Sequence, residues 1–474
     1  VRMCASMLVT VVLARLLGPE PFGLVAIAWI VIGIGNLFAD LGMSSALVQR
    51  SSISDVDVRA AFTCQVAFGA TLSVILILLA PFIGDFFKEP KVVRVVHALA
   101  PLFVLQAFGA IAASLLKRAL KFKRIQLAQV TSYLIGFVCI GIPLAAVGFA
   151  VWSLIIAQLS QTALFSLFCY TQIPHPAKPL VAFPDRKFFD FGVKVLISNL
   201  INWTLTNLPS IVIGRVFDVF ALGLYNRAYM LITTPMQSLV ASGQAVTFSG
   251  YSRRQDDLPT IRTAYLAGVG FMTLAMLPAY GSIALVPESV VQAVFGADWH
   301  DLIPLIVPLA LAMPFHALMA LGGPMLWSQD RVESETRGQI LTLAAFAAIL
   351  VWTVMISVTA IAWGIFAMSV LRFFFVTSAS LAILDVSWRE FLQSIKGGLI
   401  VLMITGPIVL ICDQLASSWH IGVAFRVALD LLTGMAAFLL TVHAVCRQIL
   451  STEMYWLWGR INHHLSGLIG NWLR

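Results

Sequence analysis

Charged side chains are scarce in this sequence. Asp, Glu, Lys and Arg make up 11% of its 474 residues, whereas hydrophobic residues make up 60% and the mean hydropathy is +0.93. Soluble domains carry about 25% charged residues. The composition therefore excludes a soluble globular domain of this length and predicts an all-α polytopic membrane protein.

Features that would indicate an enzyme are also missing. The six cysteines are scattered without metal or redox spacing, which is typical of small core residues. No loop is long enough for a separate soluble domain, and no carboxylate pair, Ser-His-Asp set or metal motif is visible. We therefore expect no enzymatic activity, no cofactor, no metal and no nucleic-acid partner.

What the sequence has in abundance is apolar runs long enough to cross a bilayer. Fourteen such runs lie near 1–17, 22–48, 60–83, 92–116, 126–146, 149–171, 189–214, 220–248, 263–286, 302–327, 338–357, 360–383, 397–412 and 422–446. Twelve spans with two re-entrant segments are the alternative.

Basic residues indicate the orientation of these spans, because cytoplasmic loops are enriched in Lys and Arg. The segment 115–124, LLKRALKFKR, is strongly basic, whereas the loop 287–301 carries three acidic residues and no Lys or Arg. With an even number of spans, both termini are predicted to be cytoplasmic.

Composition also predicts the domain organisation. A Pro-rich basic stretch lies between the sixth and seventh spans, where a cytoplasmic linker between two bundles would be. The tail mixes Trp and Leu with Arg and His, which favours an amphipathic helix on the cytoplasmic leaflet over a disordered tail. The predicted parts are a six-helix bundle at 1–172, a linker at 173–188, a second six-helix bundle at 189–384, two further helices at 385–446 and the tail at 447–474.

Residues 11–50 comprise the end of one helix, a turn at GPEP and the beginning of another helix. Part of this sequence is repeated near the middle of the chain. The segment IGRVFDVFALGLY at 213–225 aligns with this hairpin. In the alignment Arg15 corresponds to Arg215 and Gly23 to Gly223, each pair 200 residues apart without a gap. Two packed copies of one bundle are the expected result, and internal repeats of this kind are typical of transporters.

The first and seventh spans share a polar face as well. Spacings of three or four residues place each set on one side of its helix. The sets are Arg2, Ser6 and Thr10 in one span and Asn199, Asn202, Thr206 and Ser210 in the other. Such faces predict a cavity between two halves, with helix–helix hydrogen bonding as the alternative. Trp203, beside this face, is a candidate for stacking on a sugar or for contact with lipid.

Three segments resemble the signatures of the polysaccharide transporter family. They are LARLLGPEPFGLVAIA, LFADLGMSSALVQR and, at 214–231, GRVFDVFALGLYNRAYML. This family comprises O-antigen and exopolysaccharide flippases of the MOP superfamily, and the branch with colanic-acid-type exporters is the most similar. The basic segment 115–124 is similar to that family as well.

The resemblance implies two repeat-related six-helix bundles around a central cavity, with two further C-terminal spans. It implies translocation of undecaprenyl-pyrophosphate-linked oligosaccharide across the bacterial cytoplasmic membrane, for lipopolysaccharide or exopolysaccharide synthesis. Membrane lipid is then an obligatory partner, and polysaccharide polymerase and glycosyltransferases are candidate partners.

Several arginines are candidates for binding the anionic substrate. Arg15 and Arg215 either bind its pyrophosphate or acidic sugars or cap helix C-termini. Arg227 either joins the site or extends to the membrane interface. Arg372, near the middle of an apolar run, should face a cavity or an ionic partner, because a mid-membrane Arg costs about 2.5–3.5 kcal/mol.

Other titratable groups in the predicted spans have two interpretations each. Asp40 is a candidate for ion coupling, or it pairs with an Arg or caps the break at Gly42. Arg426 and Asp430, four apart, are expected to neutralise each other. His316 and His443 are either buried structural residues or proton relays.

The sequence thus predicts a flippase that works by alternating access. A drug or cation antiporter of the MATE type is the first rival, and the intramembrane excess of Arg argues against it. A membrane polysaccharide polymerase or ligase would need a large extracytoplasmic loop that is absent here. A peptidoglycan-precursor flippase fits the signatures less well.

Overall fold

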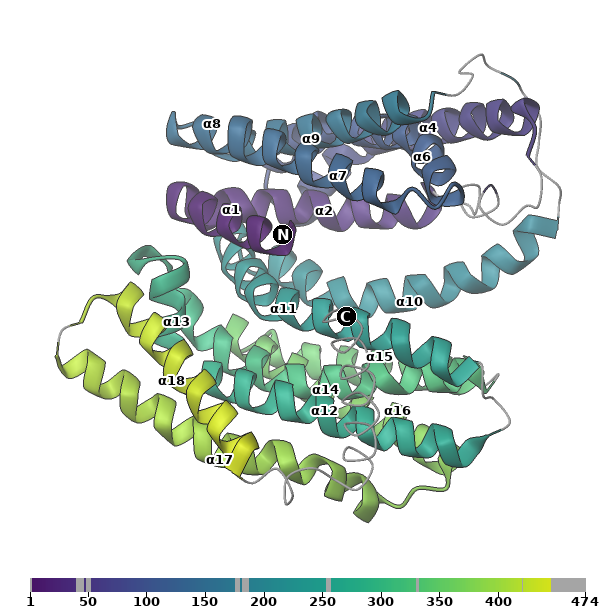
Figure 1. The fold of residues 1–474 in the computed structure, drawn as a ribbon. Helices are drawn as coiled ribbons and strands as arrows, with labels where there is room; N and C mark the ends of the chain where they lie inside the picture. The colour runs from purple at the N-terminus through teal and green to yellow at the C-terminus, as the bar shows by residue number, and fades with distance from the viewer. Residues whose placement is uncertain are drawn as a thin grey trace, which may run out of the picture. The chain divides into compact units, whose positions relative to one another are not determined.

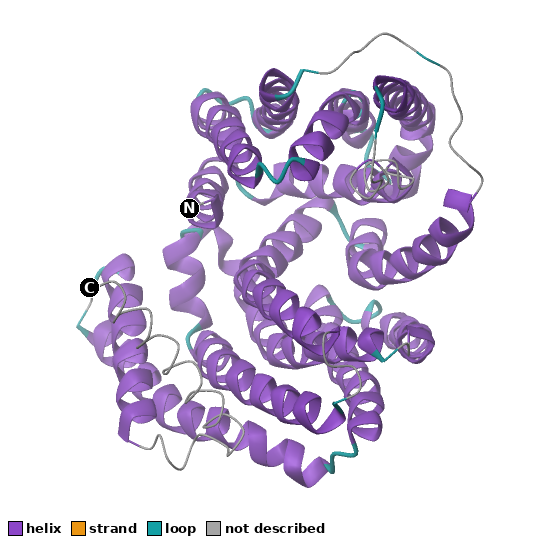
Figure 2. Cartoon of the chain, turned by 45° about the vertical axis from the view of Figure 1, so that its right-hand side comes forward, coloured by secondary structure: helices purple, strands orange, loops and turns teal. Residues whose placement is uncertain are grey.

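The structure is a computed structural model that describes residues 2–39, 47, 53–174, 180, 187–252, 257–329, 332–419 and 421–444. All regular secondary structure in these residues is helical, and Figure 2 shows no strand among them. Backbone N–H and C=O groups in hydrocarbon must bond within their own segment, which a helix achieves. The prediction of an all-α polytopic protein is therefore confirmed.

The chain forms two compact units, Val1–Asn226 and Arg227–Arg474. The helices of the first unit are α1 (Arg2–Leu17), α2 (Pro19–Ala39), α4 (Asp55–Phe87), α5 (Lys91–Leu99), α6 (Leu102–Arg118), α7 (Phe122–Tyr133), the π-helical segment η1 (Leu134–Gly141), α8 (Ile142–Ala146), α9 (Val151–Gln172) and α10 (Lys187–Val216), followed by the start of α11 (Val219–Ser252) (Figure 1).

Local sequence determines where the long helix α4 begins and ends. Ser54 and Asp57 form a capping box, in which the Asp57 N–H donates to Ser54 Oγ at 3.2 Å and the Ser54 N–H donates to Asp57 Oδ2 at 2.9 Å. At the other end, Lys88 adopts a left-handed conformation with φ of 54° and its N–H donates back to Asp85. Both devices satisfy backbone groups that a helix leaves unpaired.

The second unit contains the rest of α11 and a set of long helices. They are α12 (Leu258–Leu285), α13 (Pro287–Val294), the 3₁₀ segment η2 (Ala297–Leu302), α14 (Ile303–Ser328), α15 (Val332–Thr353), α16 (Val358–Leu384), α17 (Trp388–Ser418) and α18 (Val423–Ala444). Tyr265, Met325 and Phe391 are buried in a core shared by α12, α14, α16 and α17. Helix α12 packs against both α14 and α17.

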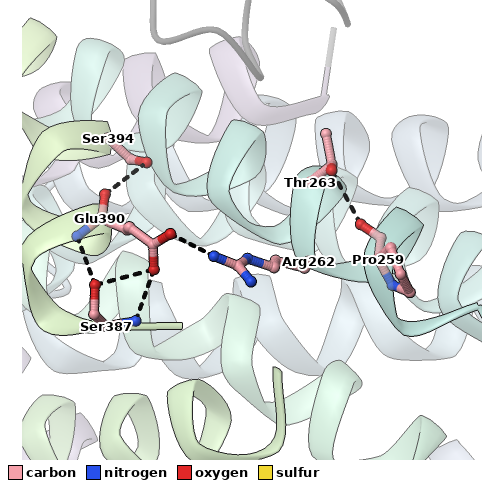
Figure 3. Close-up of polar contacts among 6 residues, drawn as sticks. All are labelled: Pro259, Arg262, Thr263, Ser387, Glu390 and Ser394. Atoms are coloured by element: carbon pink, nitrogen blue, oxygen red, sulfur yellow. Dashed lines mark hydrogen bonds and ion pairs between the residues drawn. The ribbon is translucent and has the colours of Figure 1, made fainter. Parts of the chain in front are cut away.

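A polar cluster joins the N-terminal ends of α12 and α17 (Figure 3). Ser387 and Glu390 form a second capping box, and the Glu390 carboxylate also pairs with Arg262 of α12. Ser394, one turn further along α17, donates from its hydroxyl to the Glu390 carbonyl at 3.4 Å. One carboxylate thus caps α17 and ties it to its main packing partner.

Each of the fourteen predicted spans overlaps a helix of the structure. Ten helices in the described part of the chain are long and apolar enough to cross a membrane, and two shorter apolar helices are Ala5–Leu17 and Arg337–Thr353. The count of fourteen spans and the domain boundaries at 172, 188 and 384 stay predictions. Most of the linker 173–188 and the whole tail 447–474 lie outside the described residues.

The two repeat-related hairpins have the same local design. Helices α2 and α11 begin at Pro19 and Val219, which are 200 residues apart, and each follows the preceding helix after a short turn. Gly18, with φ of 68°, provides the left-handed residue that the first turn requires. Asp218 makes the second turn by accepting the Ala221 N–H at 2.6 Å.

Within the first unit these two hairpins meet at their equivalent glycines. A Cβ on Gly23 would lie 1.9 Å from the carbonyl oxygen of Val219, and a Cβ on Gly223 would lie 2.0 Å from that of Pro19. The same Cβ on Gly223 would also lie 3.2 Å from the backbone nitrogen of Gly23. The contact is reciprocal, so the repeat relates the two helices across a local two-fold axis.

Gly223→Ala is expected to destabilise the protein by about 1–3 kcal/mol, because the added methyl overlaps a backbone carbonyl that cannot move aside. Gly23→Ala should have a similar effect, and the two changes together should cost less than their sum, because either one separates the helices. Thermal unfolding of the purified full chain in detergent measures this.

Gly268→Ala in α12 is the matched control, because a Cβ there meets only Leu321 Cδ1 at 3.8 Å. Equal melting temperatures for Gly223→Ala and Gly268→Ala would contradict the close contact.

Candidate functional site

The predicted polar face of the seventh span lies on α10 in the first unit. Asn199, Asn202 and Thr206 are exposed, whereas Ser210 is buried. The Thr206 hydroxyl donates to the Asn202 carbonyl at 2.9 Å, an intrahelical bond that keeps the side chain on the helix surface. Three of the four polar positions thus lie on the exposed side of α10.

Trp203 has a different environment from its polar neighbours. It is half-buried, and its indole nitrogen would lie 2.7 Å from a Cβ added to Gly33 of α2. Helix α10 packs against α2, and Gly33 makes room for the indole ring. The structure therefore gives Trp203 a role in helix packing, in addition to the two roles weighed from the sequence.

The repeat-related arginines also differ in environment. The Arg215 guanidinium donates to the Phe86 carbonyl at 2.7 Å and lies 5.3 Å from the centroid of the Phe86 ring. Phe86 is in the last turn of α4, where a cation stabilises free carbonyls. Arg15 is exposed on α1. The contact of Arg215 agrees with the helix-capping alternative, although the capped helix is α4 rather than α10.

Arg372 lies near the middle of α16, fourteen residues after Val358 and twelve before Leu384. It is buried, with 9% of its surface exposed. It interacts electrostatically with His316 of α14 and with Tyr229 of α11. Three helices of the second unit thus place a guanidinium, an imidazole and a phenol close together.

This cluster was only partly predicted from the sequence. The sequence indicates Arg372 as a site candidate and His316 as a structural residue or a proton relay, but nothing in the spacing connects either residue to Tyr229. Arg227, also on α11, is half-buried. The signal that could have suggested the group is that each helix carries a polar residue at mid-run, although the sequence does not show which helices are neighbours.

The arrangement suits binding of an anion. A buried guanidinium presents several N–H donors in a fixed plane that matches phosphate oxygens, and phenol and imidazole groups add further hydrogen-bonding capacity. No group of three or more His, Cys, Asp or Glu residues in the described part of the chain could hold a metal ion. Asp40 lies outside the described residues, and so does the side chain of His443.

The prediction that Arg426 and Asp430 neutralise each other is confirmed only in part, because the two groups interact electrostatically but the printed hydrogen bonds of the guanidinium go to another residue. Arg426 pairs instead with Asp413 of α17, with its Nε and Nη2 atoms each 2.6 Å from a carboxylate oxygen. A bidentate pair across two helices has better geometry than a pair four residues apart on one helix. The signal available in the sequence was Asp413 itself, the acidic residue nearest to the end of the thirteenth apolar run.

Comparison with known proteins gives a consistent family. The model of the family described as "Polysaccharide biosynthesis protein" matches residues 12–304. The chain is 26% identical over 330 residues to the lipopolysaccharide biosynthesis protein WzxC of Escherichia coli (strain K12). The aligned region covers 68% of this chain and 66% of WzxC. The chain is 24% identical over 412 residues to the teichuronic acid biosynthesis protein TuaB of Bacillus subtilis (strain 168), covering 85% and 84%.

Solved structures show the same fold at low sequence identity. The lipid II flippase MurJ in an inward closed conformation aligns with a TM-score of 0.73 and 13% identity, over 94% of this chain and 97% of that chain. An inward-facing multidrug resistance MATE family transporter of the MOP superfamily aligns with a TM-score of 0.65 and 17% identity, over 81% and 95%.

The fold is therefore shared with MurJ and with a MATE transporter, and the family model covers more than half of the sequence. On this evidence the chain belongs to the family of polysaccharide biosynthesis proteins, as the signatures in its two hairpins indicated.

Proposed function

We propose that this protein is a flippase for undecaprenyl-pyrophosphate-linked oligosaccharide in the bacterial cytoplasmic membrane. It serves the synthesis of a surface polysaccharide, lipopolysaccharide or exopolysaccharide. The observation that carries the proposal is the buried Arg372 on a MOP-type fold, which interacts electrostatically with His316 and Tyr229. A diphosphate is an anion for which such a donor set is suited.

The relatives support the same substrate class. The names of WzxC and TuaB place them in lipopolysaccharide and teichuronic acid biosynthesis, and ExoT of Rhizobium meliloti is named as a succinoglycan biosynthesis transport protein. MurJ, which shares the fold, is named as a lipid II flippase. One of these names refers to transport and another to flipping of a lipid, which favours transport over chemistry as the role of this protein.

In the proposed mechanism the head group enters a cationic cavity from the cytoplasmic side. The repeat-related halves then change their relative orientation so that the cavity opens outward, while the isoprenoid tail remains in lipid. Arg372 is the main phosphate ligand. Arg15, Arg215 and Arg227 are secondary cationic contacts, and Asn199, Asn202, Trp203 and Thr206 are candidates for sugar contacts.

Several finer features belong to the same proposal. Both termini are cytoplasmic, Asp40 is the candidate for ion coupling, and polymerase and glycosyltransferases are partners that deliver or consume the lipid-linked unit. The membrane potential contributes to transport of the anionic head group, at about 2.3 kcal/mol per charge per 100 mV.

A MATE-like cation antiporter is the second candidate, because MATE transporters share the fold with a TM-score of 0.65. The charge of the buried site supports the flippase over the antiporter. A cavity for cationic drugs requires acidic residues, whereas the buried group at the centre of α16 is a guanidinium. The second unit of this chain therefore favours an anionic substrate.

Loss of the gene is expected to block translocation while synthesis of the lipid-linked unit continues. Complete undecaprenyl-diphosphate-linked oligosaccharide should accumulate in the inner membrane, and polymer at the cell surface should be lost. Quantification of both by mass spectrometry and carbohydrate assay tests this, and the wild-type gene on a plasmid should restore both. Unchanged intermediates with new sensitivity to cationic drugs would instead indicate the antiporter.

Arg372→Ala is expected to reduce export by about tenfold or more, because a charged hydrogen-bonding partner of phosphate is worth about 1.5–3 kcal/mol. Arg372→Lys should retain part of the activity, since it keeps the charge without the bidentate geometry. Surface polysaccharide in a complemented deletion strain measures export.

Arg389→Ala, at an exposed arginine near the start of α17, is the control and should export normally. The amount of each variant in the membrane separates a transport defect from a folding defect. Normal export by Arg372→Ala would remove this residue from the site.

A further inference from the structure

Three helices of the second unit enclose a polar cluster that the flippase mechanism above does not use. They are α13, α17 and α18, and α18 packs against both of the others. The cluster comprises Ser289 of α13, Asp413 of α17 and Arg426 and Asp430 of α18. In Figure 1, α17 and α18 lie side by side with α13 near the start of α18.

Asp413 is the hydrogen-bonding centre of the cluster. Its two carboxylate oxygens accept from Arg426 Nε and Nη2 at 2.6 Å each, and the Ser289 hydroxyl donates to one of the same oxygens. The side chains of Arg426 and Asp413 are 15% and 9% exposed. The guanidinium is therefore held against α17 by two hydrogen bonds.

The carboxyl group of Asp430 is the second acidic group of this cluster. The residue is 6% exposed, and both of its carboxyl oxygens are buried without a hydrogen-bond donor. It interacts with the carboxyl group of Asp413. Two carboxyl groups can form a hydrogen bond with each other only when one of them carries a proton.

The charges near Asp430 do not balance when every acid is ionised. The charged groups on the packed helices are Asp413 of α17, Arg426 of α18 and Glu288 of α13, and Glu288 interacts with Arg426. Two buried carboxylates then face one guanidinium. A buried carboxylate that is not compensated costs several kcal/mol, and a neutral carboxylic acid avoids this cost.

We propose that Asp413 and Asp430 hold one proton between them and form a proton-binding site on α17 and α18. The protonated carboxyl of Asp430 donates to Asp413, which gives one of the two unbonded Asp430 oxygens a hydrogen bond and leaves one net carboxylate for Arg426. Release transfers this proton to water and leaves two carboxylates in repulsion across the α17–α18 contact. Protonation thus stabilises the packing of α18 on α17.

The site lies near one end of these helices. Asp413 is five residues before the end of α17, and Asp430 is seven residues after the start of α18, or about 10 Å along the helix at 1.5 Å per residue. In the predicted topology this end faces the extracytoplasmic side. The proton would therefore exchange with the compartment into which the polysaccharide unit is delivered.

Infrared spectroscopy on the purified full chain tests the proposal directly. The wild-type protein should show the carbonyl stretch of a protonated aspartic acid at neutral pH, and the band should disappear on titration to alkaline pH. Labelling with ¹³C-aspartate should shift the band. Asp430→Asn, which keeps the shape of the neutral acid, should lack it, and Asp385→Asn at an exposed position should retain it.

Thermal unfolding supplies a second measurement on the same samples. The wild-type melting temperature should fall as the pH rises through the range in which the band disappears, because proton loss creates the repulsion. The melting temperature of Asp430→Asn should not change in that range. Neither measurement depends on transport, so failure here and failure of the flippase proposal are distinguishable.

Three results would overturn the proposal. They are the absence of a protonated aspartic acid band in the wild-type protein, retention of that band in Asp430→Asn, and stabilisation by sodium chloride but not choline chloride that Asp430→Asn abolishes. The last result would show that the pair takes a sodium ion in place of the proton. If Asp430→Asn does not fold, Asp430→Thr and the labelled wild-type titration decide the same question.

Discussion

The structure depends on the requirement that every backbone N–H and C=O in hydrocarbon find a partner inside the protein. Helices meet this requirement, and it makes polar side chains expensive wherever they are not paired. Some of the described buried polar groups accordingly bridge helices, such as Arg426 with Asp413 and Ser289, whereas others, such as Ser369 and Thr405, bond to the backbone of their own helix. Arg372 of α16 interacts electrostatically with His316 and Tyr229 on two other helices.

Glycines allow the backbones of neighbouring helices to approach each other closely. Helices in lipid gain little from burying apolar surface against one another, so small residues that allow near contact become important. The reciprocal contact of Gly23 and Gly223 occurs at equivalent places in the two repeats. Gly398 of α17, where a Cβ would lie 2.5 Å from the Thr273 carbonyl of α12, is a further example in the second unit. Contacts of this kind fix where two helices cross.

The sequence indicated single residues that stand out in the apolar runs, but it did not indicate which residues on other helices they interact with. Arg372 stood out because an arginine in the middle of an apolar run is rare. Its neighbours did not stand out, because His316 and Tyr229 lie on other helices at unrelated distances along the chain. Arg426 shows the same limit, since the acid four residues away was within reach and Asp413 of the adjacent helix is the actual partner.

The sequence by itself determined the class of the protein, the helices and the family. Apolar runs of sufficient length must be helical in a membrane, and every predicted span overlaps a helix. Tertiary structure alone decided which helices touch, and hence that Trp203 lies against Gly33, that Arg215 caps α4 and that Asp430 lies beside Asp413. The physical reason is that periodicity along one helix defines a face, whereas the helix that covers this face is selected by packing of the whole bundle.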